Sequence, residues 1–238
     1  MQKSMSEDRT SITFVQTGQS TDARTRRTRA LLACGMIAGP LYIAVGVLQI
    51  LIRPGFDPTR NDLSQMSLGD LGWIQITNFI VTGLLVIACA VGMRRALRGS
   101  TGGTWGPLLL IVYGLGLIGA GFFTADPGLG FPPGTPMDAH IISWHGIVHT
   151  ISGGLGFLGL IAACFVFARR FAGRRQWGWA AYSVATGVFF LAAFVGIATG
   201  FQQNGAALVI LTLAFTGAVV IAWTWIAVLA ARLRAGLA

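Results

Sequence analysis

Side chains that could do chemistry are few in this sequence, and they gather in two polar segments. The three histidines of the chain stand close together and follow an aspartate, while a second group of polar residues lies earlier. Imidazole and carboxylate groups serve as general acids and bases and as ligands of zinc. The candidate site residues are Arg60, Asp62, Ser64, Asp126, His140, His145 and His149.

His145 and His149 are four residues apart in a segment expected to be helical, so both lie on one side of that helix. Two such imidazoles can bind one zinc ion if a third ligand approaches them. Asp126 is the preferred third ligand, and His140 is the alternative. The same spacing also suits a pair of histidines that hydrogen-bond or cap at a helix start. The metal and structural interpretations therefore both stay open.

The earlier polar segment offers capping groups and a cation. Asp62 or Ser64 can cap a short helix that leads into the next apolar stretch. Arg60 carries a charge opposite to that of Asp126 and Asp138 in the later segment. We therefore expect the two segments to pack against each other, with Arg60 next to one of these acids.

Six apolar stretches without Asp, Glu, Lys or Arg must position these polar segments. Each is at least 21 residues long, and a helix of about 20 residues crosses the roughly 30 Å of hydrocarbon in a bilayer. Strands would have to close into a barrel of short alternating segments, and the sequence has no such pattern. The expected fold class is all-α, a polytopic six-transmembrane-helix bundle. The stretches are Leu31–Ile52, Trp73–Met93, Trp105–Ala125, Gly146–Ala168, Trp177–Gly200 and Gly205–Ala231.

The basic residues predict the orientation of the bundle. Of the 17 Lys and Arg residues, 15 flank the apolar stretches on one side and only Arg53 and Arg60 fall on the other. By the positive-inside rule the crowded side is cytoplasmic, which gives an N-in, C-in topology. We expect residues 1–29 to form a disordered basic cytoplasmic tail, residues 30–231 the six-span membrane domain and residues 232–238 a short cytoplasmic tail.

Composition favours a membrane protein over a soluble domain or a nucleic-acid-binding protein. The chain is 54% hydrophobic and 11% charged, whereas soluble domains are about 25% charged. Its net charge of +9 does not indicate nucleic-acid binding, because the basic residues flank the apolar stretches. All seven tryptophans stand at or near expected span ends, as in an aromatic belt. The basic residues are almost all arginine, which suggests a GC-rich bacterial genome and the bacterial plasma (inner) membrane.

Several runs of residues resemble one known family. They are Gly121–Pro127, Phe131-Pro132-Pro133-Gly134, Ser143–His149 and Asn61-Asp62-Leu63-Ser64. Together they resemble the bacterial membrane protein family catalogued as domain of unknown function 998, over most of residues 31–231. The resemblance implies a six-span protein of the cell envelope and no established activity. Ser64 is followed here by Gln65-Met66 where the family usually has Ser-Glu-Leu, so the acid of that pattern is missing.

Three functions are compatible with these observations, and whether the chain is an enzyme stays open. The first is a non-catalytic protein that binds a lipid or a membrane-protein partner through its outer loops. The second is a metal-dependent membrane hydrolase in which His145, His149 and Asp126 hold the metal and a bound water is activated. The third is a small-molecule transporter, which the scarcity of ionisable residues inside the spans disfavours.

Overall fold

The computed structural model describes residues 2–139, 141–199 and 205–237. These residues form six α-helices and one short 3₁₀ helix, and no strand occurs among them. The elements are α1 (Gln2–Ile52), η1 (Leu63–Ser67), α2 (Gly72–Ala96), α3 (Trp105–Phe122), α4 (Trp144–Gly173), α5 (Trp177–Thr199) and α6 (Ala206–Ala235).

Each of the six α-helices contains a stretch long and apolar enough to cross a membrane. The all-α fold class and the six expected spans are therefore confirmed. The helix bounds differ from the expected ones at several ends. In particular, α3 ends at Phe122 and not at Ala125. Pro127 keeps the helix from continuing beyond this region, because the residue before a proline, here Asp126, avoids helical backbone angles. Gly200, the expected end of the fifth span, lies outside the described residues.

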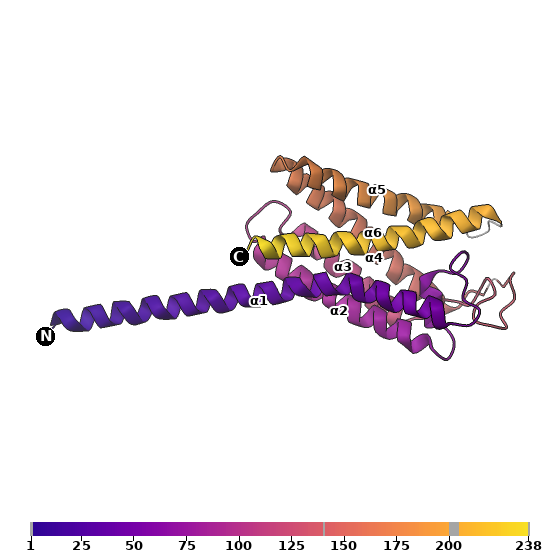
Figure 1. The fold of residues 1–238 in the computed structure, drawn as a ribbon, viewed down its shortest axis with the longest axis horizontal. Helices are drawn as coiled ribbons and strands as arrows, with labels where there is room; N and C mark the ends of the chain where they lie inside the picture. The colour runs from indigo at the N-terminus through magenta and orange to yellow at the C-terminus, as the bar shows by residue number, and fades with distance from the viewer. Residues whose placement is uncertain (1, 140, 200–204, 238) are drawn as a thin grey trace.

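The helices form a ring in chain order. Each α-helix packs against the next one along the chain, and α6 returns to pack against α1 (Figure 1). We call one end of this ring the arginine-rich end; it holds the α2–α3 connection, the α4–α5 connection and the C-terminus. The opposite end, called the loop end, holds the long connections 53–71 and 123–143.

The first helix continues beyond the ring. α1 begins at Gln2, and its N-terminal part projects away from the other helices (Figure 1). The stretch of α1 that is long and apolar enough to cross a membrane lies within Asp22–Ile52. A helix without tertiary packing is marginal in water. The disordered tail expected over residues 1–29 therefore stays a prediction, and Met1 lies outside the described residues.

Close contact between α3 and α4 depends on small residues. A Cβ added to Gly116 of α3 would lie 2.6 Å from the Ser152 carbonyl oxygen and 2.7 Å from the Gly156 Cα, both on α4. Only glycine leaves room for this approach, which is how small residues bring helices together in membranes.

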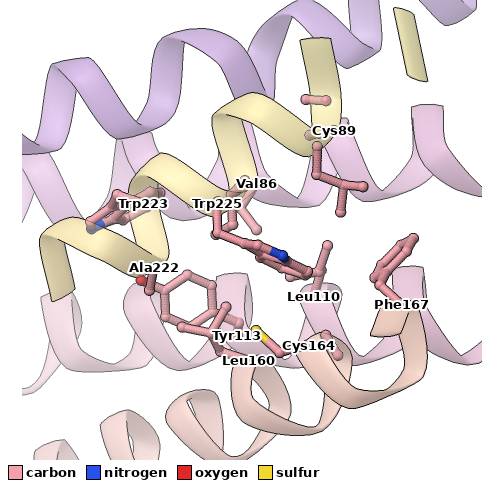
Figure 2. Packing of buried hydrophobic residues seen from close by; sticks show 14 of the residues in the cluster. Val86, Cys89, Leu110, Tyr113, Leu160, Cys164, Phe167, Ala222, Trp223 and Trp225 are labelled. Carbon is pink, nitrogen blue, oxygen red and sulfur yellow. The ribbon is translucent and has the colours of Figure 1, made fainter. Parts of the chain in front are cut away.

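Large side chains fill the part of the ring nearer the arginine-rich end. Trp223 and Trp225 of α6 are fully buried there beside Tyr113 and Phe167 (Figure 2). The Nε1–H of Trp225 donates a hydrogen bond of 3.0 Å to Ser183 Oγ on α5. The expected aromatic belt is thus wrong for these two tryptophans. It holds for Trp73, Trp105, Trp144 and Trp177, which are exposed near helix ends.

Candidate ligand-binding site at the loop end

The two long connections pack against each other across the loop end. Asn61 Nδ2 donates to the carbonyl oxygen of Leu129 at 3.3 Å, and Gln65 Nε2 donates to that of Gly128 at 3.2 Å. The rings of Phe56 and Phe131 meet edge to face with centroids 5.3 Å apart. The expected packing of the two polar segments is therefore confirmed.

The partner expected for Arg60 is wrong. Arg60 Nη1 lies 3.5 Å from Asp57 Oδ2, in the same connection. Among the described residues this is the one salt bridge. Asp57 also accepts hydrogen bonds from the Thr59 hydroxyl and backbone amide at 2.6 and 3.0 Å, which lower the pKa of its carboxyl group. Asp57 is three residues from Arg60, so the local pair forms without closing a long loop.

Arg53, at the end of α1, contacts both connections, although neither contact is with Asp126 or Asp138. Its buried guanidinium donates from Nη2 to the carbonyl oxygen of Leu68 and lies 5.4 Å from the centroid of the Phe131 ring. Burial lowers the pKa of this arginine, and the charge of Asp70 opposes that effect. The cation therefore ties the end of α1 to both connections through an aromatic face and a carbonyl.

Asp126 organises the start of α4. It accepts hydrogen bonds from the Ser143 hydroxyl at 2.5 Å and from the Ser143 backbone amide at 3.0 Å. Ser143 is the N-cap of α4, and its Oγ accepts from the Gly146 backbone amide at 3.0 Å. The negative charge thus lies at the positive end of the α4 dipole, where it is stabilising.

His149 is anchored to the end of α3. Its Nδ1 lies 2.8 Å from the Phe123 carbonyl oxygen and 3.1 Å from the Ala120 carbonyl oxygen. Because both partners can only accept, Nδ1 must carry the hydrogen. In the tautomer with its hydrogen on Nδ1, the acceptor lone pair is on Nε2. His149 is buried, and it lines two cavities described below.

His145 does not share this position. It is exposed and packs beside Trp144, with ring centroids 3.7 Å apart. Among the described residues no group of three or more His, Cys, Asp and Glu side chains could hold a metal ion. In this structure Asp126 contacts the N-cap of α4 and His149 Nδ1 contacts carbonyl oxygens of α3, while His145 is exposed, so the three side chains are engaged separately and the zinc site stays a prediction. His140, the alternative ligand, lies outside the described residues.

Two cavities meet at the candidate residues. A chamber of about 210 Å³ lies inside the loop-end half of the ring, with walls that include Phe79, Leu117, Phe157, Phe194 and Phe215. A second cavity of about 370 Å³ lies under the two connections. The residues that line both are Asp62, Ser64, His149 and Thr150. These four polar side chains thus stand where the apolar chamber joins the outer cavity.

Asp62 has the most unusual environment of these residues. Burial raises the pKa of its carboxyl group to about 6. Its Oδ1 is buried and has no hydrogen-bond partner among the described residues. Its backbone N–H donates to Gln65 Oε1 at 3.2 Å, which holds the start of η1 in place. A buried oxygen without a partner is costly, so this carboxyl group suits a ligand that can donate a hydrogen bond.

Sequence reasoning missed a buried chain of amides beside the chamber. Gln49 Nε2 of α1 donates to Gln75 Oε1 of α2 at 2.7 Å, and Asn78 Nδ2 lies 3.3 Å from the same oxygen. Asn78 Nδ2 also reaches the carbonyl oxygen of Tyr42, a residue that lines the chamber. The signal was available, because amide side chains inside membrane spans must find partners within the protein.

The chain is similar to one known protein family over most of the helical ring. A family model described as "Protein of unknown function (DUF998)" matches residues 36–232. The match includes the second part of α1, the whole of α2 to α5, most of α6 and both long connections. It confirms the resemblance seen in the loop motifs. No curated protein and no solved structure shows significant similarity to the chain.

Proposed function

We propose that this chain, which belongs to the DUF998 family of proteins of unknown function, binds an amphipathic lipid-like molecule at the loop end. The molecule would place an apolar chain in the chamber and a polar head group in the outer cavity. The observation that carries this proposal is that Asp62, Ser64, His149 and Thr150 line both cavities.

The walls of the chamber favour an apolar chain. They combine aromatic and aliphatic side chains with glycines of α4, Gly153 and Gly154, that leave the space open. Pockets for drug-sized ligands span about 300–1,000 Å³, and the chamber has about 210 Å³. It therefore suits one chain of a lipid and not a whole lipid molecule.

The polar residues between the cavities favour a head group that donates hydrogen bonds. His149 presents Nε2 as an acceptor, because Nδ1 donates to the carbonyls of α3. Asp62 presents a carboxyl oxygen without a partner, and this group is ionised above its pKa of about 6. A hydroxyl or ammonium group satisfies both acceptors, whereas a phosphate would meet a carboxylate of the same charge.

The other two functions receive less support. Transport needs a path across the bilayer, and in this conformation Trp223, Trp225 and Phe167 fill the half of the ring nearer the arginine-rich end. Metal-dependent hydrolysis needs ligands that converge, and Asp126 and His149 are committed to helix-end hydrogen bonds.

The proposal extends to the membrane and the orientation. The arginine-rich end gathers the basic residues of three connections and termini, which supports placing it in the cytoplasm. The loop-end cavities would then open toward the outside of a bacterial plasma membrane.

Mass spectrometry of lipids that remain bound after purification in mild detergent tests the proposal. In Gly153→Phe the new ring enters the chamber, because a Cβ added at Gly153 meets no atom within 4 Å. We expect this variant to lose the bound molecule while keeping its fold. Gly217→Phe on α6 is the matched control, since its added Cβ also meets open space and Gly217 does not line the chamber.

Two results would overturn the proposal. One is wild-type protein without any bound amphipathic molecule after addition of total bacterial lipid extract. The other is equal retention by the Gly153→Phe and wild-type proteins, each with an unchanged unfolding temperature.

A further inference from the structure

A large cavity at the arginine-rich end is separate from the site described above. It has a volume of about 840 Å³ and lies between the ends of α2, α4, α5 and α6. Four arginines line it: Arg98, Arg170, Arg174 and Arg232. Their apolar neighbours include Leu97, Phe171 and Val228, so the cavity has one charged and one apolar side.

The described residues supply no counter-ion for the charge in this cavity. Five of the eight acidic residues lie in the two connections at the loop end, and the other three are Glu7, Asp8 and Asp22 in the first part of the chain. No carboxylate lines the cavity, and none of the four arginines forms a salt bridge among the described residues. Converging cations without a carboxylate create a field that attracts anions.

Two of the guanidinium groups are held in place. Arg170 is almost fully buried and donates from Nη1 to Ser100 Oγ at 2.8 Å and to the Thr101 carbonyl oxygen at 2.5 Å. The guanidinium of Arg232 lies over the Trp179 ring, 4.4 Å from its centroid. Such preorganised guanidinium groups lose little entropy when they bind a phosphate through paired hydrogen bonds.

We infer that this cavity binds the phosphate of an anionic phospholipid. A lipid is favoured over a soluble phosphate compound because the cavity lies at the ends of membrane-spanning helices and carries apolar residues on one side. Basic pockets between membrane helices are known to suit anionic head groups. The chains of the lipid would follow the apolar side of the cavity, while the four arginines surround its phosphate.

Native mass spectrometry of the full chain tests this inference. Phosphatidylglycerol and phosphatidylcholine with identical acyl chains are titrated into the protein in detergent, with and without excess inorganic phosphate. The test variant is Arg174→Gln/Arg232→Gln. The control is Arg94→Gln/Arg169→Gln, which removes the same charge from exposed residues near the same end that do not line the cavity.

Wild-type protein and the control should prefer phosphatidylglycerol. The test variant should bind it about 30-fold more weakly, because each arginine near a lipid head group contributes about a factor of five. Arg174→Gln alone, at an exposed side chain, should lose about fivefold and serves if the double variant does not fold. Equal binding of the two lipids by wild-type protein, or equal loss in the control, would overturn the site. Displacement by inorganic phosphate would overturn the lipid assignment.

Discussion

At the scale of single residues, the buried carboxyl group of Asp62 makes stability depend on pH. Its pKa of about 6 in the folded protein exceeds the ordinary value of about 3.9. The folded state therefore binds more protons than the unfolded state between these values, and stability falls as pH rises from about 4 to about 6. Above about pH 6 this contribution of Asp62 to the free energy of unfolding is fully lost.

Replacing Asp62 with Asn should remove the pH-dependent loss of stability, because the amide does not ionise. We expect a higher unfolding temperature at pH 7.5, corresponding to at most about 3 kcal/mol, and a flatter profile between pH 4 and pH 6. Thermal unfolding in detergent across this range measures both. Asp138→Asn, at an exposed carboxylate, is the control. Parallel profiles for wild-type protein and Asp62→Asn would contradict the prediction.

In His149, Nδ1 bonds to carbonyl oxygens of α3 while Nε2 is left as an acceptor, and two substitutions distinguish the roles of these nitrogens. In His149→Asn the amide nitrogen can replace Nδ1 as donor to the carbonyls of Ala120 and Phe123. We expect this variant to keep most of its stability and to lose the bound lipid-like molecule. His149→Leu should lose the molecule and also about 1–3 kcal/mol, because it leaves the carbonyls without a donor. If His149→Asn retains the molecule at the wild-type level, Nε2 has no role in binding.

The histidines also show what spacing can and cannot predict. The four-residue interval put His145 and His149 on one side of a helix and turned His149 inward, as burial confirms. The spacing did not predict how far each histidine lies inside the ring. His145 is in the first turn of α4, beside exposed Trp144. A side chain at that level can reach water, so nothing forces it into the ring. The partner of Arg60 was not predictable either, because Asp57 in the same connection competes with the more distant acids for its guanidinium group.

At the scale of elements, the start of α4 depends on close packing between a glycine and a carboxylate. A Cβ on Gly146 would overlap the carboxylate oxygens of Asp126. Gly146→Ala should therefore push Asp126 away from Ser143 and cost about 1–3 kcal/mol. Thermal unfolding measures the loss. Gly173→Ala near the end of the same helix, where an added Cβ meets open space, should change stability little, and an equal loss there would refute the packing argument.

Helix positions were predictable because lipid imposes a length on each apolar stretch. Helix ends were less predictable, because side chains set them. Ser143 caps α4 at a residue ahead of the expected start. The inward positions of Trp223 and Trp225 were missed for a different reason: tryptophan near a span end also suits a lipid interface. Which face of α6 meets α1 and α5 cannot be read from its uniformly apolar composition.

At the scale of the whole molecule, the distribution of basic residues predicts the topology. Reporter fusions after residues 98 and 172 should report the cytoplasm, and fusions near residues 60 and 130 the outside. The physical reason is the concentration of 15 of the 17 basic residues on the side that holds both termini. A periplasmic signal at residue 98 would overturn this orientation. Because the lipid titrations use purified protein, they remain interpretable in either case.

The unequal filling of the ring also has a mechanical consequence. Beneath the arginine-lined cavity, the layer that contains Trp223, Trp225 and Phe167 is filled with buried side chains, while the chamber in the loop-end half leaves about 210 Å³ unfilled. Hydrostatic pressure favours states that eliminate internal voids. The protein should therefore be more compressible around the chamber than in the filled layer of Trp223, Trp225 and Phe167. A molecule that occupies the chamber would remove this softness, so its presence can be detected as resistance to pressure without knowledge of its chemical identity.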